Sequence, residues 1–162
     1  VAVLKMVNAK SAGVVLTVLP TTGDTTKVVV EGNWGLGESV VSGEVNPDHF
    51  LVDKETKDIE STINEKTKMV VYRSSGTATT DVPGDMRNQA CLSKEELLEI
   101  VRVSLDVEKH FNTPQDMEWV VDFDLPFPQN IFWVQARPAK FTKKKEDDAE
   151  YIAELMTRVF KF

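Results

Sequence analysis

The sequence predicts one α+β domain, in which a few helices pack on a mostly antiparallel sheet. Short runs rich in Val, Leu and Thr are separated by turn residues, which is typical of antiparallel strands. One longer segment, residues 94–110, instead repeats apolar side chains at helical spacing. The chain has 162 residues, of which 41% are hydrophobic, and this is enough for one compact domain.

Four short segments in the first half of the chain have the composition of strands. The Thr-Thr-Gly-Asp sequence at residues 21–24 forms a turn between the first two, because Gly accepts the positive φ of a tight reversal. We therefore expect a hairpin over residues 14–31. The four segments are residues 14–19, 27–31, 50–53 and 69–72.

The predicted helix at residues 94–110 begins with a capping box. Ser93 can accept a hydrogen bond from the first turn, and Glu96 can return one to the Ser93 backbone. Leu97, Val101 and Leu105 then define the apolar face. The stretch before this helix, residues 73–89, is expected to be a long irregular loop.

Residues 116–122 and 131–137 form a second pair of strand-like runs, joined by a loop that contains Pro126 and Pro128. Proline cannot sit in a central ladder, so an antiparallel pair with the prolines in the connection is expected. We expect a domain over residues 1–140. The remaining residues, 141–162, are expected to be a charged linker and an amphipathic helix that docks elsewhere or covers this domain's own core.

Composition excludes several functions. The net charge is -7, and the basic residues are scattered, which disfavours nucleic-acid binding. Cys91 is the single cysteine, so no internal disulfide can form and a reducing, cytoplasmic setting is expected. No apolar run approaches the roughly 20 residues that span a bilayer. The chain opens inside a strand-like run, which indicates a piece of a longer protein.

The two strands near the C-terminus carry the main candidate site. Side chains alternate between faces along a strand, so Asp116 and Glu118 share one face of the first strand. Trp133, Gln135 and Arg137 are expected to share one face of the second. If these faces align, carboxylates, a carboxamide and a guanidinium meet on one surface, with Phe132 and Val134 on the other.

Such a surface suits a magnesium nucleotide. Magnesium prefers hard oxygen ligands, often one or two carboxylates together with substrate phosphates. Arg137 has the donor geometry to bind a phosphate through two parallel hydrogen bonds. The spacing is equally compatible with an ordinary cross-strand ion pair between Glu118 and Arg137.

A glycine-rich segment, EGNWGLGESVVSG at residues 31–43, follows the second strand. Its glycines allow a tight turn or a close approach of the backbone to a ligand. The segment has neither the Walker A pattern nor the dinucleotide fingerprint. A structural turn and a phosphate cradle both remain open for it.

Five segments together resemble the phosphoenolpyruvate synthase, pyruvate phosphate dikinase and rifampin phosphotransferase family. The resemblance covers roughly residues 1–140 and implies the C-terminal lobe of an ATP-grasp domain that uses ATP and Mg²⁺. The matching segments are SAGVVLT (11–17), EGNWGLGESVVSG (31–43), PD (47–48), PQDMEW (114–119) and QARP (135–138).

The resemblance also implies roles for individual residues. Glu118 and Gln135 correspond to magnesium ligands, and Arg137 corresponds to the catalytic contact to the nucleotide phosphates. Asp116 lies nearby, and Glu31 and the glycines that follow it shape the wall of the site. Residues 4–6 fall at the family's adenine hinge, so Lys5 and Met6 are implied in cofactor binding, although Leu4 replaces the Gln usual there.

The family's remaining parts are absent from this sequence. These are an N-terminal ATP-grasp lobe and a swivelling domain whose histidine carries the phosphate. His49 and His110 lie outside any such motif, so the carrier histidine is expected elsewhere, in the same chain or in a separate subunit. Three readings stay open: a pyruvate, water dikinase, a split phenylphosphate synthase with phenol as acceptor, and a non-catalytic binding or assembly module.

Overall fold

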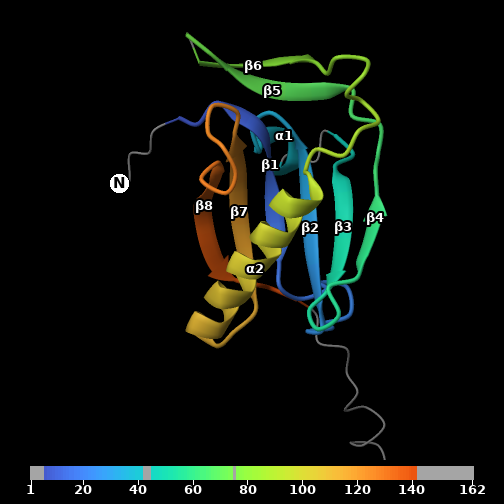
Figure 1. The fold of residues 1–162 in the computed structure, drawn as a ribbon, viewed down its shortest axis with the longest axis vertical. Coiled ribbons are helices and arrows are strands. Elements are labelled where there is room, and N and C mark those ends of the chain that lie inside the picture. Colours follow the sequence, from blue (N-terminus) through green and yellow to red (C-terminus); the bar gives the residue numbers. More distant parts are fainter. Residues whose placement is uncertain (1–5, 42–44, 75, 142–162) are drawn as a thin grey trace, which may run out of the picture.

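The largest feature of the computed structural model, which describes residues 6–41, 45–74 and 76–141, is a six-stranded sheet (Figure 1). Each strand pairs antiparallel with its neighbours, in the order β4-β3-β2-β1-β7-β8. The strands are β1 (Ala9–Leu16), β2 (Lys27–Trp34), β3 (Asp48–Asp53), β4 (Ile59–Thr62), β7 (Gln115–Asp122) and β8 (Ile131–Pro138).

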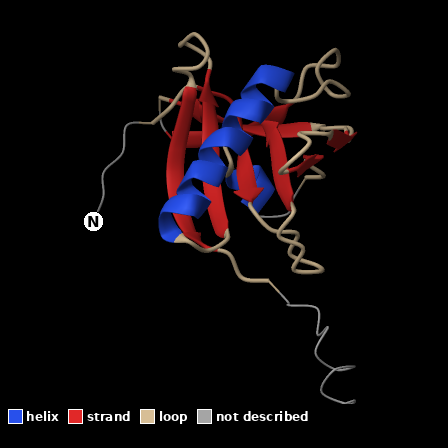
Figure 2. Cartoon of the chain, turned by 60° about the horizontal axis from the view of Figure 1, so that its bottom comes forward, coloured by secondary structure: helices blue, strands red, loops and turns tan. Residues whose placement is uncertain are grey.

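Helix α2 (Lys94–Phe111) lies diagonally across one face of this sheet, as Figures 1 and 2 show. The predicted capping box is confirmed: the Glu96 N–H donates to Ser93 Oγ at 3.2 Å, and the Ser93 N–H donates to Glu96 Oε2 at 2.9 Å. The helix ends at Asn112, whose φ of 52° breaks the helical backbone. The predicted helix at residues 94–110 is thereby confirmed to within one residue.

The core fills the space between α2 and the sheet. Val15, Val30 and Met117 point from the strands toward α2, and Ile100 and Val101 meet them from the helix. All five side chains are buried, and burial of a side chain of this size contributes about 1.5–3 kcal/mol. This packing explains why the apolar side of α2 has the spacing that the sequence shows.

Trp119 is fully buried in this core, over two glycines of neighbouring strands. A Cβ atom added at Gly13 would lie 2.7 Å from the indole ring, and one added at Gly32 would also lie 2.7 Å from it. Real Cβ atoms essentially never come so close. The two glycines therefore provide the space that the indole occupies.

The Pro-Asp segment at residues 47–48 has a structural function. Asp48 is fully buried, and its carboxylate accepts hydrogen bonds from Lys66 Nζ at 2.6 Å and from the Cys91 backbone N–H at 2.8 Å. It also accepts from the Asn64 backbone N–H at 3.1 Å. Asp48 thus joins the start of β3 to the segment before β5 and to the approach to α2.

Strands β5 (Lys68–Arg73) and β6 (Gly76–Asp81) form a separate hairpin across one end of the main sheet (Figure 1). The Leu36 N–H donates to the Val70 carbonyl at 2.8 Å, and this bond attaches the hairpin to the glycine-rich segment after β2. The expectation of an irregular loop over residues 73–89 was therefore wrong for β6. Strand β4 was also missed.

A short helix, α1 (Glu38–Val41), follows the glycine-rich segment and lies on the side of the sheet opposite α2. Its Ser39 Oγ accepts a hydrogen bond from Asn33 Nδ2 at 3.1 Å. Asn33 pairs with Ala12 in the β1–β2 register, and neither side chain faces the core cluster. One end of the second sheet face is therefore covered by α1.

The predicted α+β class, with a mostly antiparallel sheet and a few packing helices, is confirmed. The predicted hairpin over residues 14–31 is also present, although β1 begins earlier, at Ala9. The predicted C-terminal helix lies within residues 142–162, outside the described residues. Among the helices that the structure describes, none has the length and apolar character needed to cross a membrane.

Candidate functional site

The face of the main sheet opposite α2, called the open face below, carries the candidate residues of β7 and β8. The register pairs Asp116 with Arg137 and Glu118 with Gln135, and directly opposed residues share a face. The alternating residues Met117 and Trp119 are buried in the core on the other side. The four polar side chains therefore gather on the open face, as the alternation predicts.

Glu31 stands on the same face, two strands away. In the register, Glu118 lies opposite Val14, Val14 lies opposite Glu31, and Glu31 lies opposite His49. Neighbouring strands are about 4.8 Å apart, so Glu31 and Glu118 are separated by about 10 Å across the sheet. Four strands thus contribute one straight row to the open face.

A β-bulge in β8 changes part of the expected pattern. The register shifts between Glu118 and Trp119, so that Gln135 pairs with Glu118 but Trp133 pairs with Trp119. Trp133 accordingly packs against the core, and Phe132 lies opposite Val120 with its side chain exposed. The expectation that Trp133 shares a face with Gln135 and Arg137 was wrong, because the bulge inserts one residue and reverses the alternation.

Arg137 forms an ion pair with Asp116. The cross-strand ion pair with Glu118, which the spacing in the sequence also allowed, is not formed. Arg137 Nε and Nη2 lie 3.0 and 2.9 Å from the same oxygen, Asp116 Oδ2. The Arg137 side chain remains 61% exposed, whereas that of Asp116 is 19% exposed. Asp116 therefore holds the guanidinium on the open face while most of it stays accessible.

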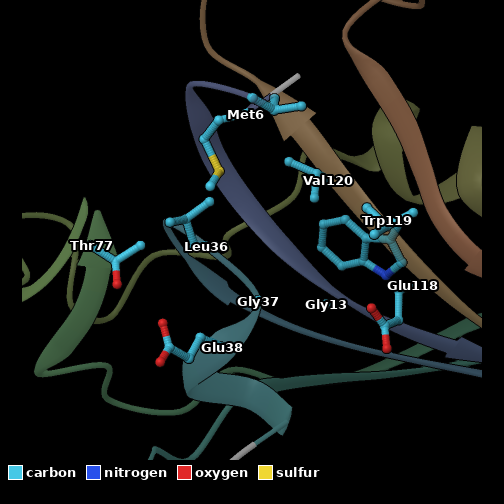
Figure 3. A pocket seen from close by; sticks show the side chains of 11 residues that line it. Met6, Gly13, Leu36, Gly37, Glu38, Thr77, Glu118, Trp119 and Val120 are labelled. Atoms are coloured by element: carbon cyan, nitrogen blue, oxygen red, sulfur yellow. The ribbon is translucent and has the colours of Figure 1, made fainter. Parts of the chain in front are cut away.

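Glu118 lines a cavity of about 490 Å³ at the end of the sheet near α1 (Figure 3). Met6, before β1, lines the same cavity, as do Leu36 and Glu38 of the glycine-rich segment. Figure 3 shows Met6, Leu36 and Val120 toward one end and the carboxylates of Glu38 and Glu118 toward the other. The cavity therefore has an apolar part and an acidic part.

The donor set near Glu118 is compatible with magnesium. Glu118 and Gln135 are directly opposed hard-oxygen donors, and neither side chain has a hydrogen-bond partner among the described residues. In the part of the chain that the structure describes, no group of three or more His, Cys, Asp and Glu side chains could hold a metal alone. Magnesium, however, usually binds one or two protein carboxylates and completes its shell with water and phosphate oxygens.

The remaining predicted residues lie in different surroundings. Glu31 Oε1 contacts His49 Nδ1 at 3.2 Å, and both side chains are about two-fifths exposed. Met6 is 51% exposed at the cavity mouth. Lys5 falls outside the described residues.

The sequence interpretation did not select several residues that line this cavity, among them Glu38, Thr77, Val120 and Val134. Glu38 lies in the glycine-rich segment, where Glu31 and the glycines were assigned to the wall of the site but Glu38 was not. Val120 and Val134 carry no chemical signal in the sequence. Thr77 belongs to β6, whose position depends on the contact between Leu36 and Val70.

Comparison with known proteins finds a family match over almost the whole chain. Residues 1–157 match the family described as pyruvate phosphate dikinase, AMP/ATP-binding domain. The chain is 38% identical to the probable phosphoenolpyruvate synthase of Staphylothermus marinus, with 96% of the chain covered. It is 36% identical to the phosphoenolpyruvate synthase of Aeropyrum pernix and 39% identical to the probable phosphoenolpyruvate synthase of Methanocaldococcus jannaschii, with 93% and 91% covered.

These relatives are much longer than the chain, which spans 22%, 22% and 13% of their respective lengths. The matched segment includes the strands β1, β2, β7 and β8 that build the open face. Both the extent of the match and the identity to these relatives lead to one conclusion. The chain belongs to the pyruvate phosphate dikinase AMP/ATP-binding domain family.

Proposed function

We propose that this chain binds magnesium ATP on its open face. In this proposal the chain is the nucleotide-binding part of a phosphoenolpyruvate synthase-like phosphotransferase, and it serves to phosphorylate a carrier histidine located elsewhere. It acts as the C-terminal lobe of an ATP-grasp domain. The remaining lobe and the histidine-bearing domain belong to other parts of the protein or to a separate subunit.

The observation that carries the proposal is the cavity shared by Met6 and Glu118. The family resemblance assigns these residues to opposite ends of a nucleotide, although 111 positions separate them in the sequence. A volume of about 490 Å³ lies within the usual range of small-molecule sites. Its apolar end suits a nucleobase, and its acidic end adjoins the donors proposed for the metal.

Each residue of the site has a separate proposed role. Glu118 and Gln135 hold the magnesium ion, which when bound neutralises phosphate charge and aligns the transferred group. Arg137 binds the phosphates through its exposed N–H groups and offsets the charge that develops during transfer. Asp116 keeps that guanidinium in place through the contacts at 2.9 and 3.0 Å. Glu31 forms part of the wall.

The names of the relatives support pyruvate, not phenol, as the final acceptor of the whole protein. Neither histidine of the chain has the surroundings expected of a phosphate carrier. His49 contacts Glu31, and His110 lies at the end of α2 with its ring against Phe111. The single cysteine, buried Cys91, fits a cytoplasmic setting.

The test is a calorimetric titration of magnesium ATP into the full-length protein that carries this chain, comparing wild type with Arg137→Ala. We expect affinity to fall by about 10-fold or more, because a charge-assisted hydrogen bond contributes about 1.5–3 kcal/mol. Arg102→Ala is the matched control, since Arg102 is equally exposed but sits on α2 and pairs with Glu99 and Asp106. Equal affinity of the Arg137→Ala variant and the wild type would remove Arg137 from the site.

A further inference from the structure

His49 is the one histidine on the open face within the described residues, and its contact is specific. It lies directly opposite Glu31 in the β2–β3 register, and its Nδ1 is 3.2 Å from Glu31 Oε1. An ionised carboxylate only accepts hydrogen bonds, so this contact is a hydrogen bond in the forms of the imidazole that carry a proton on Nδ1. The pair is half-buried, with 39% of the His49 side chain and 37% of the Glu31 side chain exposed.

The pair belongs to the row that also contains the proposed metal ligands. Across the strands from β8 to β3, the register runs Gln135, Glu118, Val14, Glu31 and His49. With a strand spacing of about 4.8 Å, Glu31 lies about 10 Å from Glu118 on the same face. Anything as large as a magnesium triphosphate held at Glu118 is therefore close to the Glu31 carboxylate.

The acidic residues of this region divide into two kinds. Asp116 is paired with Arg137, and Glu31 is paired with His49. Glu118 and Glu38 have no partner among the described residues, and these two carboxylates line the cavity. The carboxylates without a partner thus lie where a cation is proposed. The flanking carboxylates, Asp116 and Glu31, are each in contact with a basic side chain. A Glu31 carboxylate without this contact would be free to turn toward the metal of a bound polyphosphate and to compete for it.

We propose that His49 is a positioning residue of the nucleotide site. Its Nδ1 hydrogen bond fixes the Glu31 carboxylate and so keeps that carboxylate away from the metal of a bound magnesium triphosphate. The inference rests on the proposed function. It is distinct from a purely structural cross-strand pair, which would stabilise the sheet and leave nucleotide affinity unchanged.

The experiment uses the full-length protein with magnesium ATP as the probe, and measures the dissociation constant by calorimetry and the unfolding temperature by scanning fluorimetry. His49→Phe keeps a planar ring and removes the donor. We expect the dissociation constant to rise about five- to tenfold, the scale of the net contribution of one ordinary hydrogen bond. His49→Asn keeps an N–H donor at the position of Nδ1 and should restore affinity to within about twofold.

Two further measurements isolate the contact. In a Glu31→Gln background, His49→Phe should change affinity less than it does in the wild type, because the carboxylate that it holds is gone. His110→Phe makes the same change at the end of α2, on the opposite face, and should leave the dissociation constant unchanged.

Other results would overturn the inference. If His49→Phe binds magnesium ATP like wild type while Glu118→Gln loses binding, the nucleotide site stands and the role of His49 does not. If His49→Phe lowers both the unfolding temperature and the affinity, and His49→Asn recovers neither, the pair is structural only. If Glu118→Gln and Arg137→Ala also bind normally, the proposed function itself fails, and the inference fails with it.

Discussion

Single residues of the site were predictable where the strand alternation is regular. Asp116 and Glu118 share a face of β7, as period two requires, and their partners Arg137 and Gln135 follow from the register. Trp133 was misplaced because a bulge has no dependable sequence signal when it lacks glycine. The contact between His49 and Glu31 depends on the β2–β3 register, which the sequence alone does not fix.

The buried pair of Asp48 and Lys66 leads to a prediction about stability. Both side chains are fully buried and lie 2.6 Å apart. Lys66→Ala would leave the Asp48 carboxylate without its counter-charge, and loss of one partner of a buried pair costs about 3–5 kcal/mol. Urea unfolding of the chain, followed by circular dichroism, should show this decrease in the free energy of unfolding.

The matched control for this substitution is Lys68→Ala. Lys68 lies 2.7 Å from Asp81, but the two side chains are 54% and 68% exposed. A surface pair of this kind contributes at most about 1 kcal/mol. Equal decreases in the free energy of unfolding of the two variants would contradict the view that burial determines how much an ion pair contributes to stability.

At the scale of elements, predictability followed the strength of the local pattern. Helix α2 has a capping box and an apolar stripe, and both were legible in the sequence. Strands β4 and β6, which were missed, are mostly exposed, so they show no alternation between buried and exposed side chains. The hairpin is instead held by a distant contact, between Leu36 and Val70.

The start of α2 gives a prediction at this scale, because Glu96 has three functions. Its carboxylate accepts from the Ser93 N–H, from Lys10 Nζ at 2.8 Å and from Asn130 Nδ2 at 3.1 Å. Ser93→Ala should cost about 1 kcal/mol, the usual value of an N-cap. Glu96→Ala should cost more, about 2–4 kcal/mol, since it also leaves Lys10 and Asn130 unpaired.

Thermal and urea unfolding of the two variants would measure this difference. Glu95→Ala is the control, because Glu95 is an exposed acidic residue of the same helical turn. Its loss should cost no more than about 1 kcal/mol through the helix dipole. Equal destabilisation by Glu96→Ala and Ser93→Ala would mean that the contacts of Glu96 with Lys10 of β1 and with Asn130 of the β7–β8 loop make no measurable contribution to stability.

At the scale of the whole molecule, the α+β class and the position of the candidate residues followed from the sequence. The cavity did not, because it forms only where residues before β1, the glycine-rich segment, β6 and β7 meet. These contacts connect positions that no local pattern relates. The chain also spans about a fifth of the length of relatives such as those of Staphylothermus marinus and Aeropyrum pernix.

The openness of the site predicts weak binding by the chain alone. Arg137 and Gln135 are exposed on the open face, and a pocket that covers only one side of a ligand leaves much of it in water. We expect the 162-residue chain to bind magnesium ATP at least about 100-fold less tightly than the full-length protein, as measured by calorimetry. Comparable affinities would mean that the principal contacts all lie within this chain.

The indole of Trp119 above Gly13 and Gly32 has an evolutionary consequence. A methyl group at either glycine position would overlap the ring, and at Gly13 it would also meet the Glu31 carbonyl. A methyl group at Gly32 therefore requires a smaller side chain at position 119, whereas at Gly13 the overlap with the Glu31 carbonyl would remain even then. Because Glu118 precedes Trp119 on β7, any shift of the strand that a larger residue at these positions forces would also move the Glu118 carboxylate, which we propose as a metal ligand.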